Sequence, residues 1–285
     1  HVEYMILPRM PALAEVLWSS KESRNWTNFN QRLQPHLVGY EQRGLHYSKG
    51  NYKVDIKPIV ANNSLSIALE TENADGVIYY TTDGSIPTIA SMKYEKPFEV
   101  TTSMTVKAVM ALNGKVMNLK PAEQSFTFNK ATGKTVKYDT ANSRYYPANG
   151  ANTLTDGFRG TKDIGKQWHA FNGSDMVATI DFGTAVTASS ISLGCIQNWG
   201  QWVFFPQWVK FEISADGINF KEIKTVMNTV PVYARDTQIM DFSSQFASQK
   251  VKAVRVTAKN LGKCPPGHAG ENQASWLFVD EIIVE

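Results

Sequence analysis

The sequence predicts a mainly β protein that begins with a short helical segment. Apolar residues recur at helical spacing only within roughly the first fifty positions. From residue 51 the pattern changes to short runs in which apolar and polar residues alternate, and turn residues separate these runs. A polar stretch at 129–133 divides the alternating region into two blocks. We therefore expect helices followed by two β-domains.

Two amphipathic helices are expected in the N-terminal segment. In the first, Met10, Leu13, Ala14 and Leu17 follow the spacing i, i+3, i+4 and i+7 and share one face. The second covers roughly residues 26–42. Its apolar side is formed by Phe29, Leu33, Leu37 and Tyr40. Two such helices cannot bury both apolar faces against each other, so they need a larger body to pack on.

The block from 51 to 129 has the pattern of a small β-sandwich. Leu65, Ile67 and Leu69 alternate with Ser66 and Ala68. Further strands are expected at 78–82 and within 100–112. Roughly five to seven strands in a block of this size fit a sandwich. The Asp83-Gly84 pair is expected to form a hairpin turn and carry no catalytic role.

The block from 134 to 285 also consists of strand-like runs and turns. It opens on the turn Asp156-Gly157 and its surroundings. Strands are expected at 177–183, 191–193, 209–217, 251–256 and 278–284.

Composition excludes several classes of partner. The chain has 285 residues, enough for two or three domains. Its net charge of +3 comes from dispersed lysines, which indicates neither a nucleic-acid partner nor an anionic membrane surface. No apolar run reaches the ~18 residues of a membrane span. The two cysteines, Cys195 and Cys264, are either buried free thiols, the reading we favour, or one disulfide.

The N-terminal segment resembles a known family of enzymes. Its motifs are similar to the last helix of the catalytic barrel in family 20 glycoside hydrolases, the β-N-acetylhexosaminidases. They are Glu3-Tyr4-Met5, Leu7-Pro8-Arg9-Met10, Ala12-Leu13-Ala14-Glu15, Leu17-Trp18, Trp26, Phe29, Arg32-Leu33, His36 and Gly44. The resemblance implies that residues 1–50 are the helical end of a (β/α)8 barrel. It also implies that the family's catalytic groups lie earlier than this chain, so the missing barrel is an expected partner.

The two β-blocks resemble domains that accompany such barrels. The run 78–88, together with Ser91, Tyr94 and Pro97, resembles the immunoglobulin-like domain of chitobiases and hexosaminidases. The later runs resemble, in order, the discoidin-like fold, an eight-stranded jelly-roll sandwich whose carbohydrate-binding members form family 32. The expected domains are therefore 1–50, 51–129 and 130–285.

One acidic pair invites a catalytic reading. Family 20 enzymes use an adjacent Asp-Glu pair and the substrate's own acetamido group. The pair Asp280-Glu281 lies in the expected final strand and lacks the family's surrounding motif, so we expect it to be structural.

Discoidin-like sugar modules often hold a structural calcium between an early loop and the last strand. Asp156 and Glu281 are the candidate charged ligands. The alternative is that Asp156 caps its turn and Glu281 pairs with a lysine.

Sugar rings stack on exposed aromatic side chains, and their hydroxyls bind amide or guanidinium groups. The segment 197–206 mixes aromatic and polar residues between two expected strands, and the loops 159–172 and 262–275 add polar candidates. The candidate sugar-binding residues are Asn198, Trp199, Gln201, Trp202, Arg159, His169, His268 and Asn272. Packing in the core or within loops is the alternative for the tryptophans and histidines.

The expected function is glycan binding by the accessory C-terminal region of a β-N-acetylhexosaminidase. Glycans with N-acetylhexosamine or galactose-type sugars are the expected ligands, and the family implies a periplasmic or extracellular location. Two alternatives stay open. The region could brace the catalytic barrel without binding sugar, or the chain could be an active exo-hexosaminidase.

Overall fold

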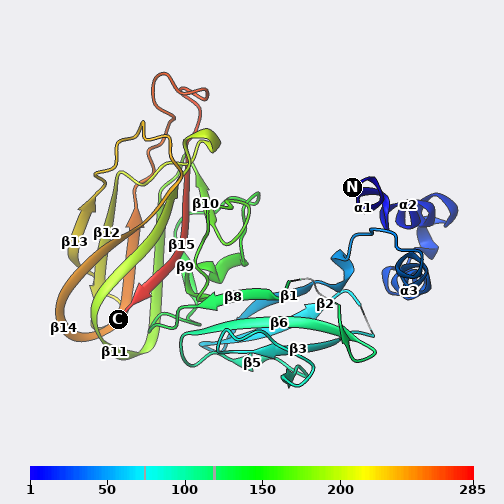
Figure 1. The fold of residues 1–285 in the computed structure, drawn as a ribbon. Coiled ribbons are helices and arrows are strands. Elements are labelled where there is room, and N and C mark those ends of the chain that lie inside the picture. Colours follow the sequence, from blue (N-terminus) through cyan, green and yellow to red (C-terminus); the bar gives the residue numbers. More distant parts are fainter. Residues whose placement is uncertain (74, 118–119) are drawn as a thin grey trace. The chain divides into compact units, whose positions relative to one another are not determined.

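The computed structural model describes residues 1–73, 75–117 and 120–285 (Figure 1). The chain forms two compact units. The first comprises His1–Lys57, Ala68–Pro97 and Thr105–Gln124, and the second comprises Pro58–Ile67, Phe98–Met104 and Ser125–Glu285. These limits differ from the three expected domains because strands β1 (Val54–Ala61) and β2 (Ser64–Thr71) run through them. The domain boundaries at 50 and 129 therefore stay a prediction.

The N-terminal segment is helical, as the sequence predicts. It contains α1 (Val2–Ile6), α2 (Arg9–Trp18) and α3 (Trp26–Gln42). The side chain of Asn25 caps α3 by accepting a hydrogen bond from the Asn28 N–H at 2.9 Å. One face of α3 is buried through Phe29, Leu33 and Leu37. That these helices end a barrel stays a proposal.

The apolar face of α2 is exposed. The side chains of Met10, Leu13 and Leu17 all lie at the surface, and Leu17 is 71% exposed. Trp18, at the end of the helix, is 91% exposed. A groove of about 510 Å³ runs between α2 and α3 and is lined on both sides by apolar side chains. Large contiguous apolar surfaces of this kind mark interaction sites.

The first β-region forms two antiparallel sheets. One has the strand order β1-β2-β5, and the other has the order β4-β3-β6-β7 with β8 also paired to β6. The strands are β1 (Val54–Ala61), β2 (Ser64–Thr71), β3 (Val77–Thr81), β4 (Met92–Lys93), β5 (Phe98–Glu99), β6 (Met104–Leu112), β7 (Lys115–Val116) and β8 (Ala122–Phe126). The expected strands at 65–69, 78–82 and 100–112 are thereby confirmed, with shifted ends.

Asp83 closes a local turn with Ser85, but the expected tight hairpin is wrong, because the connection between β3 and β4 runs from 82 to 91. Its Oδ1 atom accepts hydrogen bonds from the Ser85 N–H at 2.9 Å and from the Ser85 hydroxyl at 2.6 Å. These hydrogen bonds hold the pKa of the Asp83 carboxyl below its usual value. Gly84 follows with a φ of 78°, which glycine adopts without strain.

The C-terminal region forms a single folded-over sheet. Its strands are β9 (Val136–Tyr138), β10 (His169–Asn172), β11 (Met176–Gln197), β12 (Trp208–Ser214), β13 (Lys221–Met227), β14 (Gln238–Ala258) and β15 (Trp276–Val284). The order is β10-β15-β11-β14-β12-β13, and β9 also pairs with β11. The expected eight strands are thus seven among the described residues, because β11 continues through both 177–183 and 191–193.

The bend in β11 and β14 creates a sandwich. Irregular pairing between Asp181 and Val186, and again between Ala188 and Ser190, marks the bend in β11. Before the bend β11 neighbours only β9 and β14, and after it β11 lies between β14 and β15. Bulged strands that pass from one layer to the other form the corners of such sandwiches.

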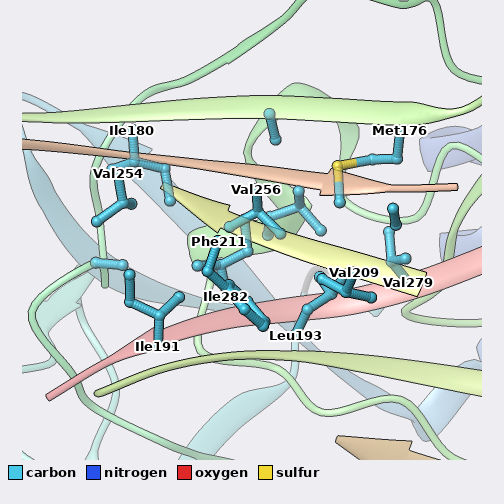
Figure 2. Close-up of a cluster of buried hydrophobic side chains, with 14 of the residues drawn as sticks. Met176, Ile180, Ile191, Leu193, Val209, Phe211, Val254, Val256, Val279 and Ile282 are labelled. Carbon is cyan, nitrogen blue, oxygen red and sulfur yellow. The ribbon is translucent and has the colours of Figure 1, made fainter. Parts of the chain in front are cut away.

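The core lies between the layers. Side chains from β11, β12, β14 and β15 converge there, as Figure 2 shows for Ile180, Leu193, Phe211, Val256 and Ile282. These residues are fully buried. The alternating apolar positions that predicted the strands therefore form the inner faces.

Three loops share one end of this sandwich, which we call the rim. Gln197 pairs with Gln238, Trp208 pairs with Met227, and Val209 pairs with Ala258. The loops 198–207, 228–237 and 259–275 therefore begin and end at neighbouring strand ends, and they project at the top of this part of Figure 1. Loops on a rigid strand scaffold are common positions for binding residues.

A buried carboxylate fixes the contact between β11 and β15. The Asp280 side chain on β15 is fully buried, and a Cβ added at Gly194 on β11 would lie 2.0 Å from its Oδ1 atom. Asp280 Oδ2 accepts hydrogen bonds from Arg159 Nε at 2.9 Å and from the Gly160 N–H at 2.8 Å. Glycine at 194 is therefore required for this ion pair.

The substitution Gly194→Ala is expected to destabilise the sandwich by about 3–5 kcal/mol, because it pushes a buried charge off its partners. Denaturant unfolding measures this loss. The matched control is Gly200→Ala, where the nearest heavy atom to the new Cβ is Asn198 Oδ1 at 3.8 Å. Equal stability of the two variants would contradict the packing described here.

Candidate functional site

An aromatic cluster occupies the rim. Trp199, Trp202 and Phe204 come from the loop 198–207, Tyr233 comes from 228–237, and His268 comes from 259–275. The ring centroids of Trp199 and His268 are 4.5 Å apart, and those of Trp199 and Tyr233 are 5.6 Å apart. Three loops that are distant in sequence thus meet through side-chain rings. We call these five residues the rim cluster.

Local backbone geometry presents Trp199 and Trp202. The short helix η4 (Trp199–Gln201) is closed by paired hydrogen bonds between the backbones of Asn198 and Val203. Trp202 has a left-handed backbone with a φ of 65°, which is uncommon outside glycine. Strained backbone of this kind gathers at functional sites.

Gly270 allows the indole of Trp202 to pack against the loop 259–275. A Cβ at this position would lie 2.8 Å from Trp202 Cε2, which is closer than real contacts allow. Trp202 is half-buried in this arrangement, and so is Trp199. Each indole therefore keeps part of its surface available at the rim.

The polar candidates surround these rings. Asn198 is half-buried and directly precedes η4, and Gln201 is exposed at its end. Asn272 is exposed and has a left-handed backbone with a φ of 65°. Amide side chains next to half-buried indoles combine the two chemistries that sugar hydroxyls and ring faces require.

Two rim residues were missed by sequence reasoning. Tyr233 is 56% exposed and packs on Trp199. Gln197 is buried at the end of β11 and contacts both neighbouring loops. A lone tyrosine in the loop 228–237 was the available signal, but nothing in its local pattern shows that this loop meets 198–207.

Arg159 is placed outside the rim cluster. Its guanidinium forms ion pairs with Asp280, through Nε at 2.9 Å, and with Asp241. These two carboxylates raise the pKa of Arg159 further, although burial opposes them. Because its hydrogen-bonding groups serve the sandwich, we leave Arg159 out of the proposed binding site.

His169 is also placed outside the rim cluster. It begins β10, pairs with Val279 and is fully buried. Its ring stacks on Tyr138 with centroids 5.0 Å apart. Burial lowers the pKa of His169 to about 4, although the carbonyl of Pro147 offsets part of the effect. A ring enclosed in this way does not reach a surface ligand, so we leave it out as well.

The two expected calcium ligands lie close together in the interior. Asp156 accepts hydrogen bonds from Asn149 Nδ2 at 2.7 Å and from the Phe158 N–H at 2.8 Å. Glu281 Oε1 accepts one from the Gly157 N–H at 3.2 Å, whereas its Oε2 atom is buried with no hydrogen-bond partner. An unpaired buried carboxylate oxygen is costly unless something else satisfies it.

The raised pKa values of these two carboxyl groups also indicate that their buried charges lack a compensating partner. Burial raises the pKa of Asp156 to about 8. Burial and the neighbouring charges of Asp156 and Asp280 raise the pKa of Glu281 well above its usual value. The described residues contain no group of three or more His, Cys, Asp or Glu side chains that could hold a metal ion. A cation here would need backbone or hydroxyl oxygens as well, which calcium accepts.

Both cysteines are buried and carry free thiols. Cys195 lies in the core on β11, and Cys264 lies in the loop 259–275. The favoured interpretation of two buried thiols is confirmed. None of the helices in the described ranges is long and apolar enough to cross a membrane.

Comparison with known proteins identifies the first β-region. The family model of the Chitobiase/beta-hexosaminidase C-terminal domain matches residues 60–119, which extend from β1 beyond β7. This match agrees with the resemblance of the run 78–88 to the immunoglobulin-like domain of chitobiases and hexosaminidases. No curated protein matches the chain.

Several solved structures are similar to the chain. Chitosan-binding module 1 of a chitosanase/glucanase from Paenibacillus sp. IK-5 shares 15% identity over 55% of this chain and 98% of that chain, with a TM-score of 0.35. A CBM32 module from Clostridium perfringens, in complex with GlcNAc-α-1,4-galactose, shares 14% identity over 55% and 94%, also with a TM-score of 0.35. The C-terminal domain of a chitobiase from Bacteroides fragilis shares 17% identity over 53% and 93%, with a TM-score of 0.34.

The environment of His169 predicts an acid-dependent stability. The folded pKa of about 4 lies below the unfolded value of about 6.5, so the unfolded chain binds more protons between these values. Stability contributed by the neutral ring is full above pH 6.5 and is lost as the pH falls toward 4. Between pH 7 and 5 the loss is expected to be about 2 kcal/mol.

Thermal or denaturant unfolding at both pH values measures this effect against His169→Phe, which keeps an aromatic ring and cannot titrate. Other buried groups titrate equally in both proteins, so the difference between them isolates His169. The same pH dependence in both proteins would refute the assignment.

Proposed function

We propose that this chain is the glycan-binding accessory region of a β-N-acetylhexosaminidase-type protein. The single observation that carries the proposal is the rim cluster, in which two half-buried tryptophans pack on His268 and one of them also packs on an exposed tyrosine. The match of residues 60–119 to a chitobiase/hexosaminidase domain supports the class of parent protein.

Binding would use two kinds of contact. The C–H faces of a pyranose ring would stack on the exposed parts of Trp199, Trp202 and Tyr233. The amides of Asn198, Gln201 and Asn272 would exchange hydrogen bonds with hydroxyl or acetamido groups. Sugars of the N-acetylhexosamine and galactose type present both features, and we propose them as ligands. Such a ligand would meet the region outside the cytoplasm, in a periplasmic or extracellular location.

We propose further that the region binds glycans and does not hydrolyse them. Its single adjacent Asp-Glu pair is Asp280-Glu281 on β15, and both side chains are fully buried. Asp280 is held by Arg159, and Glu281 faces Asp156 in the interior. Carboxyl groups enclosed in this way cannot flank a glycosidic bond.

The exposed face of α2 supports an intramolecular partner. Met10, Leu13 and Leu17 offer an apolar stripe beside the groove between α2 and α3. We propose that the remaining part of a catalytic barrel covers this stripe, because a helix with an apolar face needs a body to bury it. In the rival bracing role, the rim cluster would likewise pack on protein and would bind no sugar.

The substitution Trp199→Ala is expected to weaken glycan binding at least tenfold, because it removes the central ring of the rim cluster. A glycan array followed by titration calorimetry measures the loss. The matched control is Trp18→Ala, which removes another exposed tryptophan from α2 and should leave affinity unchanged.

Melting temperature separates the rivals. Unchanged melting with lost affinity supports binding, whereas lowered melting with no glycan bound by the wild type supports the bracing role. The same preparation is expected to release no chromophore from a chromogenic N-acetylglucosaminide. Turnover that a hexosaminidase inhibitor blocks would establish the enzymatic alternative.

We also propose a structural calcium ion held by Asp156 and Glu281. The unpartnered Oε2 atom of Glu281 and the raised pKa values of both carboxyls fit a bound cation at this position. When bound, calcium would neutralise the two charges and tie the loop 152–161 to β15. The remaining ligands would be carbonyl or hydroxyl oxygens of that loop.

Calcium is expected to raise the melting temperature by several degrees, since a ligand at a hundred times its Kd stabilises the folded state by about 2.7 kcal/mol. Thermal unfolding in calcium and in chelator measures this shift. Glu281→Gln should abolish it, and Glu271→Gln, at an exposed position, should retain it. A wild-type protein that melts identically in both buffers would rule out the ion.

A further inference from the structure

We propose that His268 and Gln197 are positioning residues of the rim cluster, which fix the relative placement of Trp199 and Tyr233 and touch no ligand themselves. This inference rests on the proposed glycan-binding function. It changes the role of His268, which the sequence suggested as a ligand contact. It also gives a role to Gln197, which the sequence did not single out.

Both nitrogens of His268 are used within the protein. Nδ1 accepts a hydrogen bond from the Gly270 N–H at 2.9 Å, so the ring hydrogen of the neutral form lies on Nε2. Nε2 lies 2.9 Å from the carbonyl oxygen of Trp199 and therefore donates to it. One ring thus joins the loops 198–207 and 259–275. A sugar hydroxyl would find neither nitrogen available.

Packing encloses the same ring. His268 is only 5% exposed. Its ring meets Trp199, Trp202 and Phe204 at steep angles, with centroids 4.5, 6.0 and 5.5 Å away. Edge-to-face contacts of this kind set the orientation of aromatic rings. His268 is therefore the point at which the two indoles are held.

Gln197 performs the corresponding task for Tyr233. It is the last residue of β11 and is almost completely buried. Its Nε2 atom donates to the carbonyls of Pro231 at 3.4 Å and Ala234 at 3.1 Å, which enclose Tyr233 in sequence. Its Oε1 atom accepts from the Phe205 N–H at 3.3 Å. One amide thus joins the loops 198–207 and 228–237.

The two residues together lock three loops before any ligand arrives. Loops that are already ordered favour binding, because ordering them when the ligand binds would cost free energy and lower the affinity. Loss of either residue should therefore weaken binding while every proposed contact residue is still present. A different side chain that restores the hydrogen bonds of a positioning residue should restore affinity. The same replacement at a contact residue should not.

The test compares paired variants by calorimetry with N,N′-diacetylchitobiose and with lactose. His268→Phe keeps a buried ring and loses both hydrogen bonds, whereas His268→Gln offers one acceptor and one donor. Gln197→Met loses all three hydrogen bonds. The matched control is Gln249→Met, which removes an exposed glutamine of β14 far along the strand from the rim end.

We expect about a tenfold loss of affinity in His268→Phe and Gln197→Met, with a single cooperative unfolding transition retained in both at a lowered melting temperature, because each leaves buried polar groups unpaired. Affinity should largely return in His268→Gln and stay unchanged in Gln249→Met. Nitrogen NMR of the free protein should show the hydrogen of His268 on Nε2.

The results distinguish failure of the proposed glycan binding from failure of the positioning role. If the wild type binds neither sugar, the proposed function fails and this inference falls with it. If the wild type binds and Trp199→Ala does not, but His268→Phe binds normally, only the positioning role is overturned. Affinity that His268→Gln does not restore, or a hydrogen on Nδ1, would also overturn it.

Discussion

Pairing between β11 and β14 is the constraint on which the C-terminal region depends. These strands pair from Met176 opposite Ala258 to Gln197 opposite Gln238, with two interruptions. Because both strands bend, one sheet forms both layers and encloses its own core. Together with the pairing of β12 to β13 and β14, this register brings the ends of five strands, β11 to β15, to the rim. Sheet geometry therefore selects which loops meet, and loop chemistry then decides what the rim can hold.

Buried polar groups add specificity to this apolar framework. Asp280, Arg159 and Gly194 fit together only in one arrangement of β11 and β15. Breaking such a pair leaves an uncompensated charge, which costs more than an exposed ion pair gains. The acidic pair that resembles catalytic machinery in sequence is thus part of the scaffold. The residues adjacent to a carboxylate in the sequence do not show whether it faces a cleft or the interior.

Much of the fold was predictable because it depends on local pattern. Helical spacing located α3 within its observed bounds, and alternation located the inner faces of β2, β11 and β15. The number of strands was wrong because a bulge, which keeps a strand continuous through a bend, has no clear sequence signal. For the site, the pattern correctly located Trp199 and Trp202 at a loop between strands.

Long-range pairing decided the remaining site assignments. His169 and Arg159 lie in a segment that looks polar and loop-like, yet β15 pairs with the first and Asp280 binds the second. Tyr233 and Gln197 belong to the rim only because Gln197 and Gln238 are opposite each other. Such partners are separated by tens of residues, so spacing along the chain cannot reveal them.

The reactivity of the two thiols can report local opening of the C-terminal region. Cys195 is enclosed in the core, whereas Cys264 is buried within the rim loop that also carries His268. Since a buried thiol reacts only when its surroundings open, labelling of Cys264 without Cys195 would report opening of that loop alone. The reactivity of Cys264 thus reports opening of the rim and that of Cys195 reports opening of the core, with no engineered label.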